Sequence, residues 1–388
     1  MAKPKKGTSD IMAAAMEGLT SGMSGFSMCS LQEYEDKLWG IGLPHFSQQY
    51  LFSTTALPFS CPIVMFAKPG RCKSTLGYYF AALVAKSKAA GGNEGVSYLI
   101  DTEHKISPNL VRSFFEDDLD QTTQQHSRLQ ILPVNSLNKG QAIAVALAAN
   151  YKKKCPERNI PVCCIFDSIS GAGTDESAAK MEKEGGIGRG VTDSALRNKH
   201  LFENWSALVN DGKEDLPILF FCISHEGEQI STGGPHMPSA PKPKGSNVMQ
   251  FKTPTMVHIT SQLIGSKTNP GIRLKLDTAK NSFGCKRKIN LDFRWKPTPD
   301  DPLSPLLGGR LDWARATAEL LADPPIPKKT LDEYIHVSLS DDGFVTCPEL
   351  GLTKAPCEEL EIALHLNQKL YDQLLGLFAV QKIKAFGE

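Results

Sequence analysis

The sequence predicts an α/β fold: a central, largely parallel β-sheet with an antiparallel extension and with helices on both faces. Two observations carry this prediction. Strand-like and helix-like segments alternate over residues 46–300, which is the pattern of a layered α/β domain. The first four strand-like segments are almost continuously apolar, as strands are when a parallel sheet is covered on both faces.

Seven segments have the composition of strands. The first four are separated by helical segments and are expected to lie parallel, and they occupy residues 62–67, 96–101, 162–167 and 216–223. The last three follow one another closely and are expected to form the antiparallel extension, and they occupy residues 256–263, 271–278 and 288–295. The tripeptide Asn-Pro-Gly at 269–271 provides the turn between the first two of these.

Two helices have clear sequence signals. The first follows the first strand over residues 74–90 and is expected to end at the glycine pair behind it. The second spans residues 193–210 and carries its apolar side chains on one face. The apolar run 142–149 predicts a buried helix, and the three lysines at 152–154 predict a helix end rather than a DNA contact.

The composition divides the chain into three parts. Residues 1–45 are rich in Ala, Met, Ser and Gly and predict an N-terminal arm for oligomerisation, while residues 46–300 hold the predicted core. From about residue 300, Pro and Leu become frequent. Residues 301–388 therefore predict a smaller C-terminal module, which ends in a long amphipathic helix over 358–384.

Composition and charge exclude several classes of protein. The 43 Lys and Arg residues against 42 Asp and Glu leave a net charge of +1, which excludes a globally basic nucleic-acid coat but allows a local patch. No apolar run approaches the roughly 18–20 residues of a membrane span, and no apolar segment follows the basic start. We therefore expect a cytoplasmic protein without a membrane span or secretory signal. None of the ten cysteines forms a C-x-x-C pair, which favours reduced, buried thiols over a zinc site.

The strongest motif is a phosphate-binding loop of the Walker A type at 66–75, between a predicted strand and a predicted helix. Such a loop needs backbone N–H groups around the phosphates, a lysine that reaches the β/γ oxygens and a hydroxyl group for Mg²⁺. Lys73 and Ser74 supply the last two, although Ala67 and Cys72 replace the two glycines of the motif. We expect ATP to be bound by Ala67, Lys68, Pro69, Gly70, Arg71, Cys72, Lys73, Ser74 and Thr75.

Three predicted strands end in polar side chains suited to nucleotide chemistry. Asp167 ends an apolar strand in the Walker B manner and would hold Mg²⁺ through water, beside Ser74. Glu103 follows another strand and is placed to polarise a water against the γ-phosphate. His225 ends a third strand, ahead of a long loop, where it could sense the γ-phosphate and pass its state to that loop. In a parallel sheet these ends gather along one edge.

Two long segments lack strong periodicity, and long loops inside a compact domain are usually functional or disordered. Residues 172–192 are rich in glycine, and residues 226–247 are rich in glycine and proline. Glycine lets backbone amides approach phosphates, while Arg and Lys supply charge. The candidate DNA-binding residues in and beside these loops are Arg189, Arg197, Lys242 and Lys244. The alternative is a solvated loop with incidental basic residues. Neither loop interleaves aromatic residues, so base stacking is not predicted.

In this order, the motifs resemble those of the RecA-type recombinases, and most of all those of the UvsX-like recombinases of tailed phages. The pattern Ile-Asp-Thr-Glu-His at 100–104 is similar to the family's strand with the catalytic glutamate, and Phe-Asp-Ser at 166–168 is similar to its Walker B segment. UvsX-like members end their third strand in Asn-His, where this chain has Ser224-His225. The resemblance covers roughly residues 50–300 and implies a RecA-like P-loop ATPase core.

The resemblance implies an enzyme, a DNA-dependent ATPase that uses ATP and Mg²⁺. It would form helical filaments on single-stranded DNA and promote pairing and strand exchange with homologous duplex DNA, in recombination, repair and replication. ATP would lie between subunits, with Glu103 and His225 on one side and Lys280 of the next subunit on the other. Ser282 stands where the family usually has a second basic residue, and Leu110 stands where it has an adenine-stacking aromatic residue. Single-strand-binding and loader proteins would be further partners, in the host cytoplasm.

Two other functions remain open from the sequence. A ring-forming helicase or another motor could share the same core, and such motors usually present an arginine finger after the late strands, where Arg287 and Arg294 are available. A degenerate, non-hydrolysing accessory protein that binds DNA or a recombinase is the second alternative. The replacement of both motif glycines, by Ala67 and Cys72, motivates it.

Overall fold

The computed structural model describes most of the chain. The described residues are 38–59, 61–87, 94–115, 128–155, 157, 159–171, 173–175, 190–209, 216–227, 241–244, 247–265, 270–296 and 308–387. Three predicted features lie wholly or largely outside them: the N-terminal arm, Arg189 and the greater part of the two long loops.

Ten of the described strands form a mixed central sheet, in the order β12-β11-β10-β9-β3-β7-β6-β4-β5 with the short β8 paired to β7. The parallel strands are β9 (Thr255–Gly265), β3 (Pro62–Ala67), β7 (Ile218–Gly227), β6 (Val162–Asp167), β4 (Val96–Asp101) and β5 (Leu129–Pro133). The antiparallel strands beside them are β10 (Pro270–Asn281), β11 (Lys288–Lys296) and β12 (Gly308–Asp312). A mixed, mostly parallel sheet in an α/β chain is what the sequence predicts.

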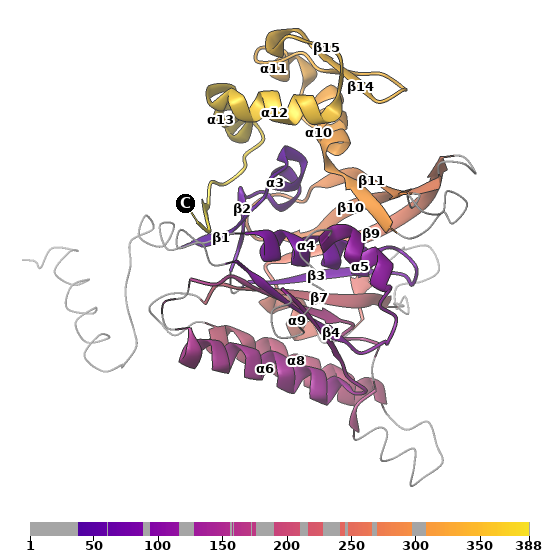
Figure 1. The fold of residues 1–388 in the computed structure, drawn as a ribbon, viewed down its shortest axis with the longest axis vertical. Coiled ribbons are helices and arrows are strands. Elements are labelled where there is room, and N and C mark those ends of the chain that lie inside the picture. Colours follow the sequence, from indigo (N-terminus) through magenta and orange to yellow (C-terminus); the bar gives the residue numbers. More distant parts are fainter. Residues whose placement is uncertain are drawn as a thin grey trace, which may run out of the picture.

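Helices cover both faces of this sheet (Figure 1). On one face lie α4 (Lys73–Lys86) and α5 (Pro108–Phe115), and on the other lie α6 (Leu137–Lys154), α8 (Gly190–Val209) and α9 (Asn247–Lys252). Successive side chains of a strand point to opposite faces. Ile63 and Met65 of β3 accordingly pack in the hydrophobic cluster around α4, while Val64 and Phe66 pack in the cluster around α6 and α8. The phosphate loop thus starts from a strand that is buried on both sides.

Three strands, β3, β4 and β6, have the predicted bounds, and β7 does not. We expected β7 to end at residue 223, ahead of His225, but it continues to Gly227. The cause is a long-range contact, because β8 (Lys242–Pro243) pairs antiparallel with Glu226 and Gly227 and extends the ladder. His225 therefore lies inside a strand that is tied to the returning end of the 226–247 segment.

The helices also differ from the prediction at their ends. α4 ends at Lys86 instead of residue 90, where the N–H of Ser87 donates to the carbonyl of Val84. α8 begins at Gly190, three residues early, and α6 is much longer than the apolar run that predicted it. The three lysines at 152–154 form the last turn of α6, which confirms that they mark a helix end. The sequence analysis missed β5 altogether.

The long C-terminal helix predicted over 358–384 is wrong. Two shorter helices, α12 (Cys357–Leu366) and α13 (Gln368–Leu377), occupy its place. Asn367 separates them, and its side chain accepts a hydrogen bond from the N–H of Leu370 at 3.2 Å. Asparagine is a strong N-cap residue, so it starts a new helix here instead of continuing the first.

The C-terminal strand pairs with the first strand of the described residues. β16 (Lys384–Ala385) pairs in parallel with β1 (Trp39–Gly42), which pairs with β2 (Ala56–Pro58). The other described elements of these two regions are α3 (Phe46–Phe52), α10 (Trp313–Ala322), α11 (Lys328–Leu331), β13 (Ser338–Leu339), β14 (Phe344–Cys347), the 3₁₀ turn η1 (Pro348–Leu350) and β15 (Leu352–Pro356). One hydrophobic cluster joins α3, α4, α10 and α13. The predicted division of the chain at residue 300 stays a prediction. Among the described helices, none has the length and apolar character that crossing a membrane requires.

Arg287, one of the two candidates for an arginine finger, is only 3% exposed. Its Nη2 donates to the carbonyl oxygens of Phe378 at 2.5 Å and Ala379 at 3.0 Å, just beyond α13. Its guanidinium lies 4.4 Å above the ring centre of Tyr50. A cation is favoured at a helix C-terminus and over an aromatic face. Arg287 therefore holds the C-terminal segment against the sheet, and the expectation that it is available to a nucleotide is wrong.

Asp292 of β11 is the centre of a cluster of charged side chains. Its carboxylate is buried and accepts hydrogen bonds from Arg273, on the paired strand β10, at 2.7 and 3.1 Å. Arg294 lies 3.5 Å from it, and Arg315 of α10 lies 3.8 Å from it. Glu319 joins Arg273 and Arg315 at 2.8 and 3.1 Å. Buried charges are stable only when they are paired in this way. The cluster fixes α10 to the antiparallel part of the sheet.

We expect Asp292→Ala to lower the free energy of unfolding by about 1.5–3 kcal/mol, because Arg273 loses its two hydrogen bonds to Asp292 and keeps only its ion pair with Glu319. The control is Asp277→Ala on the neighbouring strand, which removes a 3.0 Å ion pair with the exposed Lys288 and should cost less than about 1 kcal/mol. Urea titration of both variants measures the difference. Equal losses in the two variants would show that the cluster does not hold α10 in place.

Candidate functional site

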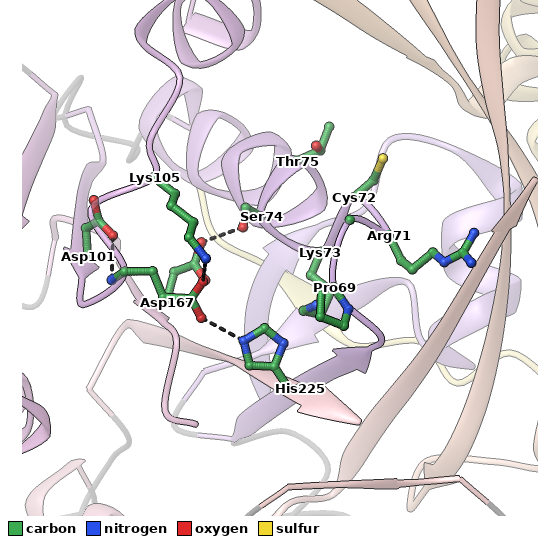
Figure 2. Close-up of a pocket in the computed structure, with 12 residues that line it drawn as sticks. Pro69, Arg71, Cys72, Lys73, Ser74, Thr75, Asp101, Lys105, Asp167 and His225 are labelled. Atoms are coloured by element: carbon green, nitrogen blue, oxygen red, sulfur yellow. Dashed lines mark hydrogen bonds and ion pairs between the residues drawn. The ribbon is translucent and has the colours of Figure 1, made fainter. Parts of the chain in front are cut away.

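The carboxyl ends of β3, β4, β6 and β7 lie side by side at one edge of the sheet. The strand register pairs Ala67 with His225 and Asp101 with Asp167. Ligands of open α/β sheets bind at this edge. A pocket of about 310 Å³ opens there, lined by residues 69–75 of the phosphate loop and by the polar strand ends (Figure 2). The predicted nucleotide residues are therefore brought together, except that Ala67, which is buried, and Lys68, which is exposed, do not line the pocket.

The backbone of the phosphate loop turns sharply through two left-handed residues. Gly70 has a φ of 71° and Cys72 a φ of 56°. Cys72 is also the N-cap of α4, and no side-chain hydrogen bond caps the helix there. Glycine adopts this conformation freely and cysteine adopts it at a cost. The chain thus forms the turn that the motif requires without its second glycine, and it aims the N-terminus of α4 at the pocket.

Lys73 is folded back over the loop. Its Nζ donates to the carbonyl oxygens of Ala67 at 3.2 Å and Lys68 at 3.1 Å. Burial lowers the pKa of Lys73, and the nearby carboxylates of Asp167 and Glu103 offset this only in part. A buried ammonium group held by two carbonyl oxygens gains from exchanging them for an anion, since charged partners make the stronger hydrogen bonds.

Arg71 and Thr75 do not point their polar groups into the pocket's centre. The guanidinium of Arg71 donates to the carbonyl of Ser261 at 2.7 Å and to its hydroxyl at 3.1 Å, which ties the phosphate loop to β9. Thr75 is buried in the first turn of α4. Arg71 and Thr75 therefore shape the loop, and the direct approach to a ligand is left to the lysine and serine between them.

Ser74 and Asp167 form the candidate metal site. The hydroxyl of Ser74 donates to Oδ2 of Asp167 at 2.5 Å. Burial, together with the carboxylates of Glu103 and Asp101, raises the pKa of Asp167 to about 6 against the opposing effects of Ser74 and Lys73. Mg²⁺ prefers hard oxygen ligands, and it usually takes one or two from the protein and the rest from phosphates and water. A hydroxyl group and a carboxylate under excess negative charge fit this requirement. No group of three or more His, Cys, Asp or Glu among the described residues forms a second metal site.

Glu103 is held by three side chains from three segments. Its Oε1 accepts hydrogen bonds from Ser168 Oγ at 2.6 Å and from His225 Nε2 at 2.8 Å. Its Oε2 accepts from Lys105 Nζ at 3.1 Å. Burial alone would raise the pKa of Glu103, but these three donors lower it to about 2. The carboxylate is therefore charged at neutral pH and fixed in direction, as a group that orients a water molecule must be.

His225 connects this carboxylate to the segment behind β7. The backbone N–H of His225 donates to Ser170 Oγ at 2.7 Å, and the backbone carbonyl of His225 accepts from the N–H of Lys244 at 2.7 Å. The hydroxyl of Ser224 lies within donor reach of the carbonyl oxygens of Lys244, at 2.9 Å, and His225, at 3.0 Å. Hydrogen bonds of His225 thus connect Glu103, through the His225 side chain, to Lys244, through the His225 carbonyl, and Lys244 lies near the end of the predicted 226–247 loop.

Sequence reasoning gave no role to three residues that complete the site. Asp101 Oδ1 accepts from the N–H groups of Glu103 at 3.1 Å and His104 at 2.8 Å, which fixes the loop that carries Glu103. Ser168 and Lys105 are the other donors to that glutamate. Ser168 could have been found from the sequence, because it directly follows Asp167 in the Walker B pattern. Lys105 lies in a loop without periodicity, so nothing in the sequence marked it.

Lys280 is not brought together with Glu103 and His225. It lines a second pocket of about 770 Å³, and its Nζ donates to the carbonyls of Gln250 at 2.7 Å and Phe251 at 3.2 Å. The side chain of Phe251 is 81% exposed. Lys280 does not line the pocket that holds Glu103 and His225, which is compatible with the predicted contact to a nucleotide of a neighbouring molecule. That contact remains a prediction.

The candidate DNA-binding residues are only partly described. Lys242 lies on the wall of the second pocket, together with Lys286 and Lys288, and Lys244 is exposed beside it. Arg197 is half-buried on α8, and Arg189 lies outside the described residues. Lys242 and Lys244 thus sit on the strand and turn that His225 touches.

A scan of the chain against models of known protein families finds no match, and a search of curated proteins finds no significant match. The assignment of an activity therefore depends on the geometry of the pocket and on the resemblance of its motifs.

The two left-handed residues of the loop give a prediction about stability. Cys72→Gly should raise the free energy of unfolding slightly, by about 0.5 kcal/mol, because glycine removes the cost of a positive φ but adds flexibility to the unfolded chain. Gly70→Ala should lower it by about 1–2 kcal/mol for the opposite reason. Differential scanning calorimetry of the two variants measures both changes. Shifts in the same direction would contradict the conformation assigned to this loop.

The hydrogen bonds to Glu103 give a prediction about pH. Because the folded chain lowers the pKa of Glu103 from 4.5 to about 2, the stabilisation is fully present above pH 4.5 and is lost as the pH falls toward 2. Glu103→Gln should lower the free energy of unfolding by about 2 kcal/mol at pH 7, less than the whole shift because the pocket admits solvent. The deficit should shrink between pH 4.5 and pH 2.

The control for this measurement is Glu203→Gln, which removes exposed pairs with Lys199 and His200 on α8 and should change stability by less than about 0.5 kcal/mol. Urea titrations at a series of pH values supply both curves. A deficit for Glu103→Gln that stays constant down to pH 2 would mean that the three donors do not favour the charged carboxylate.

Proposed function

We propose that this chain is an ATP-dependent recombinase of the RecA type, which polymerises on single-stranded DNA and promotes pairing and exchange with homologous duplex DNA. The observation that carries the proposal is the hydrogen-bonded path from Glu103 through His225 to Lys244. It joins a pocket suited to nucleotide phosphates to the segment where DNA-binding residues are expected. A nucleotide pocket with such a link is what an ATP-switched DNA-binding protein needs.

In this proposal the phosphates of ATP lie against the N-terminus of α4, and the ammonium group of Lys73 reaches the β- and γ-phosphates. Ser74 and Asp167 hold Mg²⁺, which supplies charge neutralisation between these phosphates. Glu103 orients a water molecule toward the γ-phosphate and accepts its proton. The fixed direction of the Glu103 carboxylate supports this role, because catalysis by positioning depends on a defined geometry.

DNA binding is proposed to follow from the same contacts. His225 would respond to the γ-phosphate through its side chain, while its backbone holds the N–H of Lys244 at 2.7 Å. Lys242 and Lys244 would then present their charges to the phosphates of a DNA strand. A net charge of +1 makes such a local patch necessary.

The position of Lys280 supports an assembly of several subunits. It lines a different pocket from Glu103, so we infer that a site using both residues is formed by two copies of the chain. A helical filament on DNA supplies such copies at every step, with loader and single-strand-binding proteins as further partners. We place this assembly in the cytoplasm, that of the host if a phage encodes the chain.

The two alternatives receive less support. A ring-forming motor would need an arginine finger, but Arg287 is buried against α13, and Arg294 is paired with Asp292 at 3.5 Å. A non-hydrolysing accessory protein was motivated by the missing glycines of the phosphate loop. Cys72 nevertheless adopts the left-handed conformation that the loop requires.

The test is ATP hydrolysis with and without single-stranded DNA, together with ATP-stimulated DNA affinity, for four forms of the protein. The wild type should hydrolyse ATP faster with DNA, and Lys73→Ala should lose both activities. Glu103→Gln should reduce turnover by roughly 10²-fold or more while ATP still raises DNA affinity. His225→Ala should still bind ATP, but ATP should no longer raise its DNA affinity much.

Two results would contradict this proposal in different ways. If Lys73→Ala hydrolyses ATP at the wild-type rate, the phosphate-loop assignment is wrong. If Glu103→Gln and His225→Ala lose both activities in the same proportion, His225 is a part of the hydrolytic site and does not link it to the DNA-binding segment.

A further inference from the structure

Lys105 is a cation of the pocket that the proposed function leaves without a role. It lines the pocket together with Lys73, and its side chain is 77% exposed whereas that of Glu103 is only 15% exposed. Figure 2 shows Lys105 reaching into the pocket from the side opposite the phosphate loop. Its ammonium group forms a 3.1 Å ion pair with Glu103 Oε2.

This ion pair is weaker than the other contacts of the same carboxylate. Ser168 and His225 donate to the inner oxygen of Glu103 at 2.6 and 2.8 Å, from positions that are buried or nearly so. Ion pairs of well-exposed lysines contribute roughly 0–1 kcal/mol, because water and salt screen them. Glu103 therefore stays in place when Lys105 moves, and Lys105 can change its partner at little cost.

The charges of the pocket favour such a change when a phosphate is present. Three carboxylates line the pocket, those of Asp101, Glu103 and Asp167. The guanidinium of Arg71 is already bonded to Ser261. A phosphate group beside Glu103 would be repelled by the negative charge of that carboxylate. A lysine within hydrogen-bond reach of the carboxylate can compensate the negative charges of both groups.

We propose that Lys105 binds the terminal phosphate of a nucleoside triphosphate and thereby distinguishes triphosphate from diphosphate. This rests on the proposed function, in which the γ-phosphate lies between Lys73 and Glu103. A group that is 3.1 Å from Glu103 is then next to the γ-phosphate, whereas the β-phosphate lies back toward the N-terminus of α4. Lys73 contacts both the diphosphate and the triphosphate, and Lys105 contacts only the triphosphate.

The experiment compares the binding of ATPγS and ADP, each with Mg²⁺, to the full chain by calorimetric titration. Lys105→Met keeps the length of the side chain and removes its charge. It should weaken ATPγS by about tenfold and change ADP affinity less than twofold. Lys105→Arg should restore most of the ATPγS affinity. Lys329→Met, on α11 and exposed, is the matched control and should change neither affinity.

A second comparison distinguishes a direct contact from an effect through Glu103. In the Glu103→Gln background, Lys105→Met should still weaken ATPγS by about the same factor, because the phosphate is its partner. If the loss disappears in that background, Lys105 acts only by positioning Glu103, and the inference is overturned. The loss should also shrink at high salt, since an exposed cation is screened.

The remaining outcomes separate this inference from the proposed function. Equal losses of ATPγS and ADP affinity in Lys105→Met, or no loss of either, overturn the inference while nucleotide binding stands. If the wild type binds neither nucleotide, or if Lys73→Ala binds both as the wild type does, the pocket is not a nucleotide site and both proposals fail.

Discussion

The carboxylate of Glu103 is the point on which the arrangement of the pocket depends. It accepts hydrogen bonds from Ser168 at the end of β6, from His225 of β7 and from Lys105 of its own loop. A carboxylate that leaves water must find such donors, and two of them, Ser168 and His225, are fixed in turn by hydrogen bonds of their own backbone N–H groups. The sheet edge, the segment after β6 and the end of the 226–247 segment are thereby tied to one group. Any ligand that redistributes these donors acts on all three segments at once.

The parallel sheet makes this convergence available. Four adjacent strands end at the same edge of the sheet, and the N-terminus of α4 lies at that edge too. Cationic and anionic groups therefore meet within one pocket of about 310 Å³. The antiparallel strands beside them serve a different purpose. They carry Lys280 away from this pocket and anchor α10 through Asp292. Glu103 and Lys280 thus line different pockets, which suits the proposed repeating assembly.

Local sequence patterns predicted the central strands correctly, and they failed where contacts between distant segments determine the bounds of an element. The buried strands β3, β4 and β6 follow from their apolar runs, and so does the meeting of Lys73, Asp167 and Glu103 at one edge. β5 is an edge strand with an exposed Ile131, so its pattern is weak. The extension of β7 past His225 depends on pairing with β8, and the break at Asn367 depends on a cap that competes with the helix. Lys105 lies in a loop, and a loop has no regular side-chain periodicity from which its contact with Glu103 could be predicted.

Hydrogen exchange of the backbone amides, measured with and without Mg²⁺ and ATPγS, tests the central claim most directly. The claim is that the pocket holds a nucleoside triphosphate and that His225 passes its presence to Lys244. The account predicts that the nucleotide slows exchange in the phosphate loop at 69–75 and also at 241–244, and that His225→Ala keeps the first effect and loses the second. Slower exchange in the phosphate loop alone, or an undiminished effect at 241–244 in His225→Ala, would contradict it.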